Sequence, residues 1–166
     1  MGIYYQIILA LFIVVVIQVI LFAVIFNKIR KKTPKDGIRI NEKIPNINCL
    51  DIDQQRSELF SNISKGGDTL LFSIVNCTAC TKVLDILNTM QPKYLENIIL
   101  IIANSDDSAK ELVSSKYSGR ALLAKKSDVI EYFNIKAFPF VLRIDGNMLV
   151  KDKDYASIES LLKHIL

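Results

Sequence analysis

The stretch from residue 70 to residue 87, LLFSIVNCTACTKVLDIL, decides the fold of the chain. Its first part, Leu70 to Val75, is almost wholly apolar, which is typical of a parallel strand covered on both faces. Its second part repeats apolar residues at helical spacing, at Val83, Leu84 and Leu87. The sequence therefore predicts a buried strand that leads directly into a helix, with a Cys-Thr-Ala-Cys motif at the junction.

Cys77 and Cys80 lie where a thiol can become reactive. The first turn of a helix has unpaired backbone N–H groups and the positive end of the helix dipole, and both favour thiolate over thiol. Because the thiolate is the reactive form, such a pair can exchange disulfides, with Cys77 attacking and Cys80 resolving. Half of a zinc site shared between two chains, or a chance spacing, also produces a CxxC motif. The strand and helix around the motif favour redox chemistry.

Residues 3–26 are almost wholly apolar, and Gln6 and Gln18 interrupt the run. A helix rises about 1.5 Å per residue, so this segment is long enough to cross the ~30 Å hydrocarbon core of a membrane. A cleaved signal peptide is the alternative, but the run is long and has neither a basic start nor an A-x-A exit. We therefore expect a single-pass anchor at residues 3–26.

Residues 27–41, NKIRKKTPKDGIRIN, are polar and basic, and we expect them to form a juxtamembrane tether. Five basic residues lie between Lys28 and Lys35, which accounts for much of the formal charge of +4. No basic patch with interleaved aromatic residues occurs elsewhere, so nucleic-acid binding is not expected.

Residues 42–166 alternate strand-like and helix-like segments. Strands are expected at 44–50 on an edge, at 97–103 and at 121–124, with a hairpin around Asp145-Gly146-Asn147. Helices are expected at 108–116, at 127–133 with Ser127 or Asp128 as the cap, and at 156–166. Pro92 marks the end or a kink of the helix that follows the cysteines. This order predicts an α/β domain with a mixed sheet flanked by helices.

Three segments of this domain resemble the membrane-anchored, thioredoxin-like thiol–disulfide oxidoreductases of the TlpA and MauD type, MauD being the methylamine dehydrogenase accessory protein. The segments are Lys43-Ile44-Pro45, LLFSIVNCTAC at 70–80 and AFPFVLRIDGNMLV at 137–150. The resemblance covers nearly everything from residue 42 onward. It implies a thioredoxin-like fold with a strand–helix insertion at about residues 95–118, between the CxxC motif and Pro139.

The resemblance also implies how the site binds its substrate. Pro139 would be cis and would pack beside the CxxC motif, which leaves the backbone of Phe138 free to pair with a protein client; an ordinary edge-strand proline is the alternative. The expected partners are a protein thiol or disulfide client and a membrane electron donor or acceptor, because the chain has no second redox domain to recycle its thiols. No cofactor and no metal is expected.

Three features depart from the pattern of that family. Asn76 stands where a tryptophan is common before the first cysteine, and the dipeptide inside the motif is Thr-Ala, without proline. Leu71 and Val83 are apolar, so the acidic residue that many relatives use near the motif has no evident counterpart. The route of the proton at Cys80 therefore stays open.

Several other residues are expected to have structural roles. Cys49 lies in an apolar strand position and is expected to be a small buried hydrophobe, with a third redox cysteine as the alternative. His164 is expected at the surface or at a helix C-terminus, and Arg120 and Arg143 are expected to be surface charges. The aromatic residues are expected to be mostly core, with Phe138 also able to form a rim for substrate; they are Tyr132, Phe133, Phe138 and Phe140.

Three other functions compete with disulfide exchange. A peroxiredoxin needs a proline ahead of its cysteine, and Ser73-Ile74-Val75-Asn76-Cys77 lacks one. Copper-delivery relatives of this fold use a CxxxC motif with a distant histidine, whereas the spacing here is CxxC. A non-catalytic interaction domain with incidental cysteines is the third. Reversible thiol cycling, as opposed to stoichiometric metal retention, separates these classes.

Two opposing arguments concern the side of the membrane on which the soluble domain lies. The basic residues from Lys28 to Lys35 favour a cytoplasmic domain under the positive-inside rule. The chemistry favours the other side, because a cytosol poised by soluble thiol systems has little need of an anchored copy, whereas an exported domain must stay near its electron source. MauD-type relatives also face the outside of the membrane, despite a basic residue just after their anchors. We expect a cell-membrane protein with its soluble domain on the extracytoplasmic side.

Overall fold

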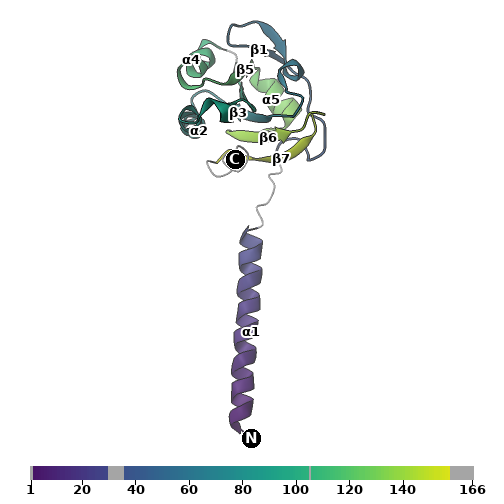
Figure 1. The fold of residues 1–166 in the computed structure, drawn as a ribbon, viewed down its shortest axis with the longest axis vertical. Helices are drawn as coiled ribbons and strands as arrows, with labels where there is room; N and C mark the ends of the chain where they lie inside the picture. Colours follow the sequence, from purple (N-terminus) through teal and green to yellow (C-terminus); the bar gives the residue numbers. More distant parts are fainter. Residues whose placement is uncertain (1, 30–35, 105, 158–166) are drawn as a thin grey trace. The chain divides into compact units, whose positions relative to one another are not determined.

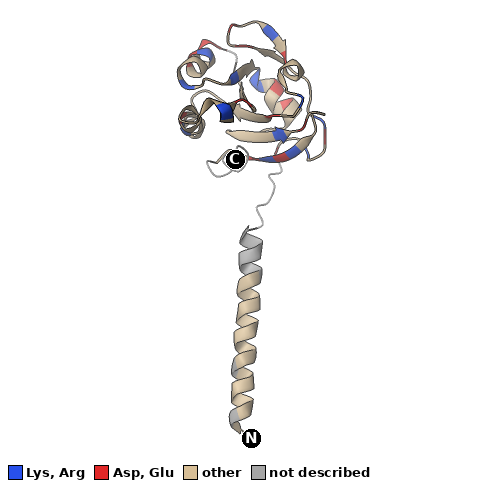
Figure 2. Cartoon of the chain, in the orientation of Figure 1, with Lys and Arg blue, Asp and Glu red and all other residues tan. Residues whose placement is uncertain are grey.

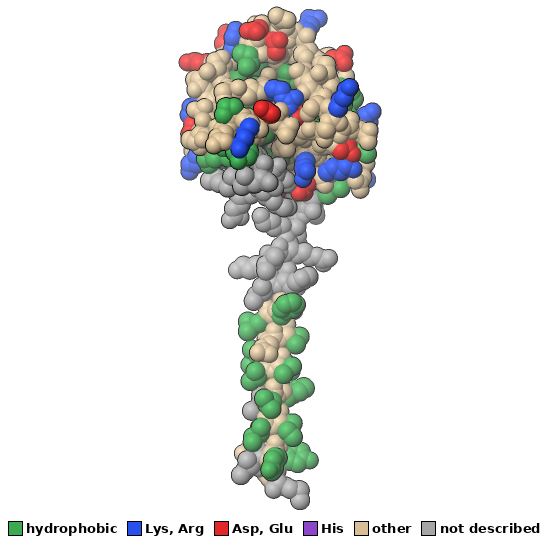
Figure 3. All heavy atoms as spheres, viewed as in Figure 1, with side chains coloured by type: hydrophobic (Ala, Val, Ile, Leu, Met, Phe, Trp, Pro, Cys, Tyr) green, Lys and Arg blue, Asp and Glu red, His purple; other side chains and the backbone are tan. Residues whose placement is uncertain are grey.

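A computed structural model describes residues 2–29, 36–104 and 106–157 of the chain. The chain divides into two compact units, residues 1–33 and residues 34–166 (Figure 1). The first unit contains α1 (Gly2–Ile29). Apolar side chains are exposed all along its Tyr4–Phe22 segment, as the green spheres in Figure 3 show. By length and composition this helix can span a membrane as an anchor, and a signal sequence has the same features.

The second unit is built on one mixed sheet of seven strands in the order β2-β1-β5-β4-β3-β6-β7. Strand β3 is parallel to β4, β4 is parallel to β5, and the remaining pairs are antiparallel. The strand bounds are β1 Asn48–Leu50, β2 Arg56–Glu58, β3 Thr69–Ser73, β4 Ile98–Ile102, β5 Arg120–Ala124, β6 Phe140–Ile144 and β7 Val150–Tyr155.

Helices cover both faces of the sheet (Figure 1). Their bounds are η1 Leu59–Asn62, α2 Thr78–Asn88, α3 Pro92–Leu95, α4 Asp107–Lys116 and α5 Lys126–Phe133. Helices α2 and α4 pack on the face that carries Leu71, whereas α5 packs on the face that carries Leu70 and Phe72. Both faces of β3 are therefore buried, as its apolar sequence predicts. This central position fixes the end of β3, from which the cysteine motif follows.

The structure corrects several local predictions. Strand β3 ends at Ser73, so Ile74 and Val75 belong to the turn that follows it. Strand β1 is internal, because the β2 hairpin partner occupies the edge beyond it. Pro92 begins the short helix α3, at a position where its missing N–H group costs no hydrogen bond.

Helix α5 differs from its predicted form in its N-cap and in the exposure of Tyr132. The N-cap of α5 is Lys125, which makes no side-chain cap; the Ser127 hydroxyl instead hydrogen-bonds to the Asp128 carboxylate. Tyr132 lies on the solvent side of α5 with 55% of its surface exposed, so it is not a core residue. The predicted helix at 156–166, including His164, lies outside the described residues apart from Ala156 and Ser157.

Arg120 is not the free surface charge that the sequence suggests. Its guanidinium pairs with the buried carboxylate of Asp68 and donates to the carbonyl oxygen of Asn62 at 2.8 Å. Asp68 also accepts hydrogen bonds from the backbone N–H and the hydroxyl of Ser64, at 2.6 and 2.8 Å. This polar cluster joins β5 to the loop that enters β3. Elsewhere in the described domain, basic and acidic residues are interspersed along the ribbon (Figure 2).

Residues that precede position 42 are hydrogen-bonded to the domain. The buried ammonium group of Lys153 donates to the carbonyl oxygens of Asp36 and Gly37, at 2.8 and 3.2 Å. The Tyr155 hydroxyl donates to the Asp36 carboxylate at 2.6 Å. Gly37 has φ +80°, and a Cβ atom there would lie 2.7 Å from the ring of Phe140. Residues 36 and 37, expected in the tether, are therefore fastened to β6 and β7.

Candidate active site

The turn between β3 and α2 places the cysteine motif at a helix start. Asn76 has φ +60°, a left-handed backbone conformation that asparagine tolerates better than most residues. Cys77 returns to an extended conformation, with φ −113° and ψ 109°, and is the N-cap of α2. The residue with positive φ thus directly precedes the N-cap of α2.

The sulfur of Cys77 occupies the place of a helix-capping oxygen. Its Sγ atom accepts a hydrogen bond from the backbone N–H of Cys80 at 3.2 Å. The Cα atoms of the two cysteines are 5.2 Å apart, and their sulfurs lie at disulfide-bonding distance. An N-cap acceptor satisfies one of the orphan N–H groups of the first turn, and negative charge there is favoured by the helix dipole. This position therefore stabilises a thiolate on Cys77 when the pair is reduced.

The two cysteines differ in exposure. Cys77 is partly exposed, whereas Cys80 is fully buried on the inner face of α2 with Val83 and Leu84. A reagent that approaches from solvent therefore reaches Cys77 first. Burial without a compensating charge favours a neutral thiol over a thiolate at Cys80.

The segment before β6 reaches the motif from far along the sequence. The Phe138–Pro139 peptide bond is cis. The carbonyl oxygen of Phe138 lies 3.9 Å from Cys77 Sγ, although the two residues are 61 positions apart. The Pro139 carbonyl oxygen accepts from the N–H of Ala156 at 2.9 Å, which ties this segment to the end of β7. The structure thus brings Phe138 next to Cys77, while Pro139 is buried behind it.

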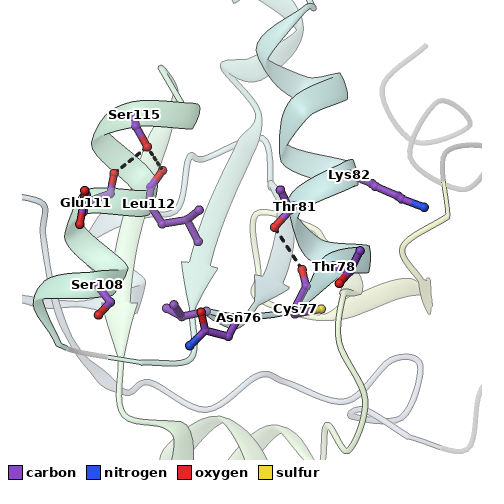
Figure 4. A pocket seen from close by; sticks show the side chains of 10 residues that line it. Asn76, Cys77, Thr78, Thr81, Lys82, Ser108, Glu111, Leu112 and Ser115 are labelled. Atoms are coloured by element: carbon purple, nitrogen blue, oxygen red, sulfur yellow. Dashed lines mark hydrogen bonds between the residues drawn. The ribbon is translucent and has the colours of Figure 1, made fainter.

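A cavity of about 700 Å³ opens beside Cys77, between α2 and α4 (Figure 4). No sequence motif marks the α4 residues that line this cavity, because the packing of α4 beside α2 follows from the order of the strands. Figure 4 shows Lys82 directed away from α4. The lining residues are Val75, Asn76, Cys77, Thr78, Thr81, Lys82, Ser108, Glu111, Leu112 and Ser115.

The other candidate residues are structural. Cys49 is a free thiol buried in β1, and burial, aided by the negative charge of Asp128, raises its pKa to about 12. Leu71 and Val83, the two apolar residues at the positions discussed for a buried acid, are both buried. Among the described residues, no cluster of three or more histidine, cysteine or acidic side chains has the arrangement of a metal site.

No protein-family model matches this sequence, and no curated protein sequence matches it either. Solved structures resemble the domain clearly. The thioredoxin domain of a thiol-disulfide oxidoreductase from Bacteroides vulgatus has a TM-score of 0.63 at 16% identity, covering 78% of this chain and 100% of that one. A thiol:disulfide interchange protein from Bacteroides sp. has a TM-score of 0.62 at 17% identity, covering 76% and 88%.

A third similar structure is a peroxidoxin from Mycobacterium tuberculosis. It has a TM-score of 0.64 at 13% identity, covering 77% of this chain and 94% of that one. At such identities the likeness establishes the fold and not the activity. The chain therefore has a thioredoxin-like α/β fold, with a mixed sheet flanked by helices.

Proposed function

We propose that this chain is a thiol–disulfide oxidoreductase that exchanges disulfides with a protein client through Cys77 and Cys80. The observation that carries the proposal is the asymmetry of the pair. Cys77 is partly exposed, and its Sγ caps α2 by accepting from the Cys80 N–H, whereas Cys80 is fully buried. An exposed, dipole-stabilised sulfur next to a buried partner is the arrangement that ordered exchange requires.

The reaction follows from this order. The Cys77 thiolate attacks one sulfur of a client disulfide, a new S–S bond forms, and the other client sulfur leaves as a thiolate and takes a proton. Cys80 then attacks Cys77 Sγ, which forms the Cys77–Cys80 disulfide and breaks the bond to the client, and the first client sulfur leaves as a thiol that carries the proton given up by Cys80. Two electrons pass from the cysteine pair to the client, and the reverse sequence oxidises a client dithiol.

Phe138 and Pro139 are proposed as the client-docking edge. The support is the approach of the Phe138 carbonyl oxygen to Cys77 Sγ, because a client sulfur bonded to Cys77 would bring client backbone next to that carbonyl. The partly exposed Phe138 side chain supplies an apolar contact at the same place. Two of the similar structures are a thiol-disulfide oxidoreductase domain and an interchange protein, which agrees with this use of the site.

We further propose that residues 3–26 anchor the chain in the cell membrane, in the manner of TlpA- and MauD-type proteins. The soluble domain, expected at residues 42–166 and joined by residues 36 and 37 through Lys153 and Tyr155, would then face the extracytoplasmic side behind the rest of the tether at 27–41, and a membrane electron donor or acceptor would recycle the cysteines. A membrane-impermeant maleimide added to intact cells after reduction tests the side. Labelling of Cys77 before lysis supports the proposal, and labelling only after lysis contradicts it.

Redox titration tests the proposed activity. The purified full chain, in detergent, is equilibrated with thiol buffers of graded potential, and its free thiols are counted; zinc and copper retention are measured in parallel. We expect one reversible two-electron transition between about −270 mV and about −120 mV, the range from thioredoxin to DsbA. Stoichiometric metal retention without such a transition would mean that the site binds metal and does not exchange disulfides.

A further inference from the structure

We propose that Asn76 is a positioning residue that sets the reactivity of Cys77 through its left-handed backbone conformation. This inference rests on the proposed function, because it concerns the reactivity of the attacking thiol. Asn76 is one of five described non-glycine residues with positive φ, and it directly precedes the cysteine motif. Its side chain is exposed and lines the cavity between α2 and α4 (Figure 4).

The cap geometry of Cys77 depends on the direction in which the chain enters the helix. On the helix side, Cys77 is held by its own turn: its carbonyl oxygen accepts from the N–H and the hydroxyl of Thr81, at 3.0 and 3.2 Å. On the strand side, β3 ends at Ser73, and Val75, in the turn that follows, packs against the core cluster that contains Leu71, Val83 and Leu84. Asn76 lies between the packed side chain of Val75 and the cap residue Cys77, and its φ of +60° sets the direction in which the backbone enters Cys77.

The residue type at position 76 controls how easily that junction forms. Glycine adopts positive φ freely, asparagine adopts it at modest cost, and a β-branched residue is strongly disfavoured there. A valine at position 76 would favour an extended backbone, which redirects Cys77 and moves its Sγ away from the Cys80 N–H. The thiolate would then lose a hydrogen bond and part of its interaction with the helix dipole.

Two substitutions separate this backbone role from a role of the amide side chain. Asn76→Gly removes the amide and keeps access to positive φ, whereas Asn76→Val removes both. Asn41→Val is the matched control, because Asn41 has φ +66° and is exposed. Asn41 and Pro139 are bound at opposite ends of β7. The Asn41 N–H donates to the carbonyl oxygen of Val150, the first residue of the strand, whereas the Pro139 carbonyl oxygen accepts from the N–H of Ala156, just after its last residue.

The experiment measures the rate of Cys77 alkylation by iodoacetamide against pH in the reduced full chain, followed by mass spectrometry of the Cys77 peptide. We expect a wild-type midpoint below the free-thiol value of about 8.5, the same midpoint in Asn76→Gly, and a midpoint raised by about one pH unit in Asn76→Val. Asn41→Val is expected to lower the melting temperature and leave the midpoint unchanged.

If Asn76→Val folds and keeps the wild-type midpoint of Cys77 alkylation, the inference is overturned. If Asn76→Gly raises the midpoint as much as Asn76→Val does, the amide side chain and not the backbone conformation controls the reactivity of Cys77. If Asn76→Val does not fold, Asn76→Ala carries the same comparison with a smaller expected rise. The redox titration of the wild-type chain is independent of these variants. Absence of a Cys77–Cys80 transition therefore refutes the proposed function, whereas a normal transition with equal midpoints refutes only the role of Asn76.

Discussion

The backbone N–H of Cys80 donates a hydrogen bond to the sulfur of Cys77, with a nitrogen–sulfur distance of 3.2 Å. The proposed resolving cysteine thus contacts the sulfur of the proposed attacking cysteine through its backbone N–H group. Stabilisation of the Cys77 thiolate is then independent of the thiol at position 80.

Replacement of Cys80 by alanine should therefore leave Cys77 reactive. Alanine keeps the N–H group and the helix, so we expect the pH midpoint for Cys77 alkylation in Cys80→Ala to match that of the reduced wild-type chain within about 0.3 units. Alkylation followed by mass spectrometry measures this. A midpoint that rises to the free-thiol value of about 8.5 would mean that the Cys80 side chain supplies the stabilisation.

The pair of Asp68 and Arg120 should contribute strongly to stability. The Asp68 side chain is fully buried, so Asp68→Asn leaves the Arg120 guanidinium without its anionic partner inside the polar cluster. We expect a loss of about 2–3 kcal/mol in the free energy of unfolding, measured by urea denaturation. Asp85→Asn is the control, because the Asp85–Lys116 pair is solvent-exposed and should change stability by less than about 0.5 kcal/mol. Equal effects of the two substitutions would contradict the assigned role.

The attachment of residues 36 and 37 to the domain can be tested at Gly37. An alanine there would have to keep φ near +80° and would place its Cβ atom 2.7 Å from the Phe140 ring. We expect Gly37→Ala to lower the melting temperature by about 5 °C or more. Gly66→Ala is the control, since a Cβ atom at Gly66 meets no atom within 4 Å. Two equally small shifts would indicate that Gly37 is not fastened to the domain in solution.

Asp145 should make stability depend on pH in the acid range. Its carboxylate accepts from the N–H groups of Leu149 and Asn147, both at 2.9 Å, and pairs with Lys151 at 3.0 Å. The Leu149 hydrogen bond, with the help of Lys151, lowers the pKa of Asp145 below its ordinary value of 3.8. Because the folded-state pKa lies below the unfolded one, this stabilisation is present above pH 3.8 and is lost as the pH falls through the folded-state pKa.

Asp145→Asn should consequently lower the melting temperature at neutral pH, and the difference from the wild-type chain should shrink below about pH 4. Thermal melts between neutral pH and pH 3 measure both curves. A difference that stays constant across this range would show that the charge of Asp145 is not the stabilising feature.

The elements that local patterns determine are predictable from this sequence. The apolar run before Cys77 and the helical spacing after it predict the β3–α2 junction, because both patterns follow from burial on one or two faces. The turn at Asp145 is predictable from its Asp-Gly-Asn sequence, and Asp145 caps it by accepting from the Asn147 N–H.

Features that depend on distant partners are not predictable in this way. Arg120 looks like a surface charge until the fold brings Asp68, 52 residues away, next to it. The internal position of β1 depends on its pairing with both β2 and β5. The cavity beside Cys77 requires α4 to lie next to α2, and no local pattern specifies that neighbour. The assignment of Phe138 and Pro139 to client docking stays a prediction that only binding experiments test.

The most direct test of ordered exchange is the capture of a client disulfide by single-cysteine variants of the pair. The full-length Cys80→Ser and Cys77→Ser chains are reduced, incubated with disulfide-containing extracytoplasmic proteins and analysed on non-reducing gels. If Cys77 attacks and Cys80 resolves, as proposed, Cys80→Ser should accumulate a covalent complex that dithiothreitol releases, and Cys77→Ser should capture none. Equal capture by both variants, or capture by neither, would contradict the account.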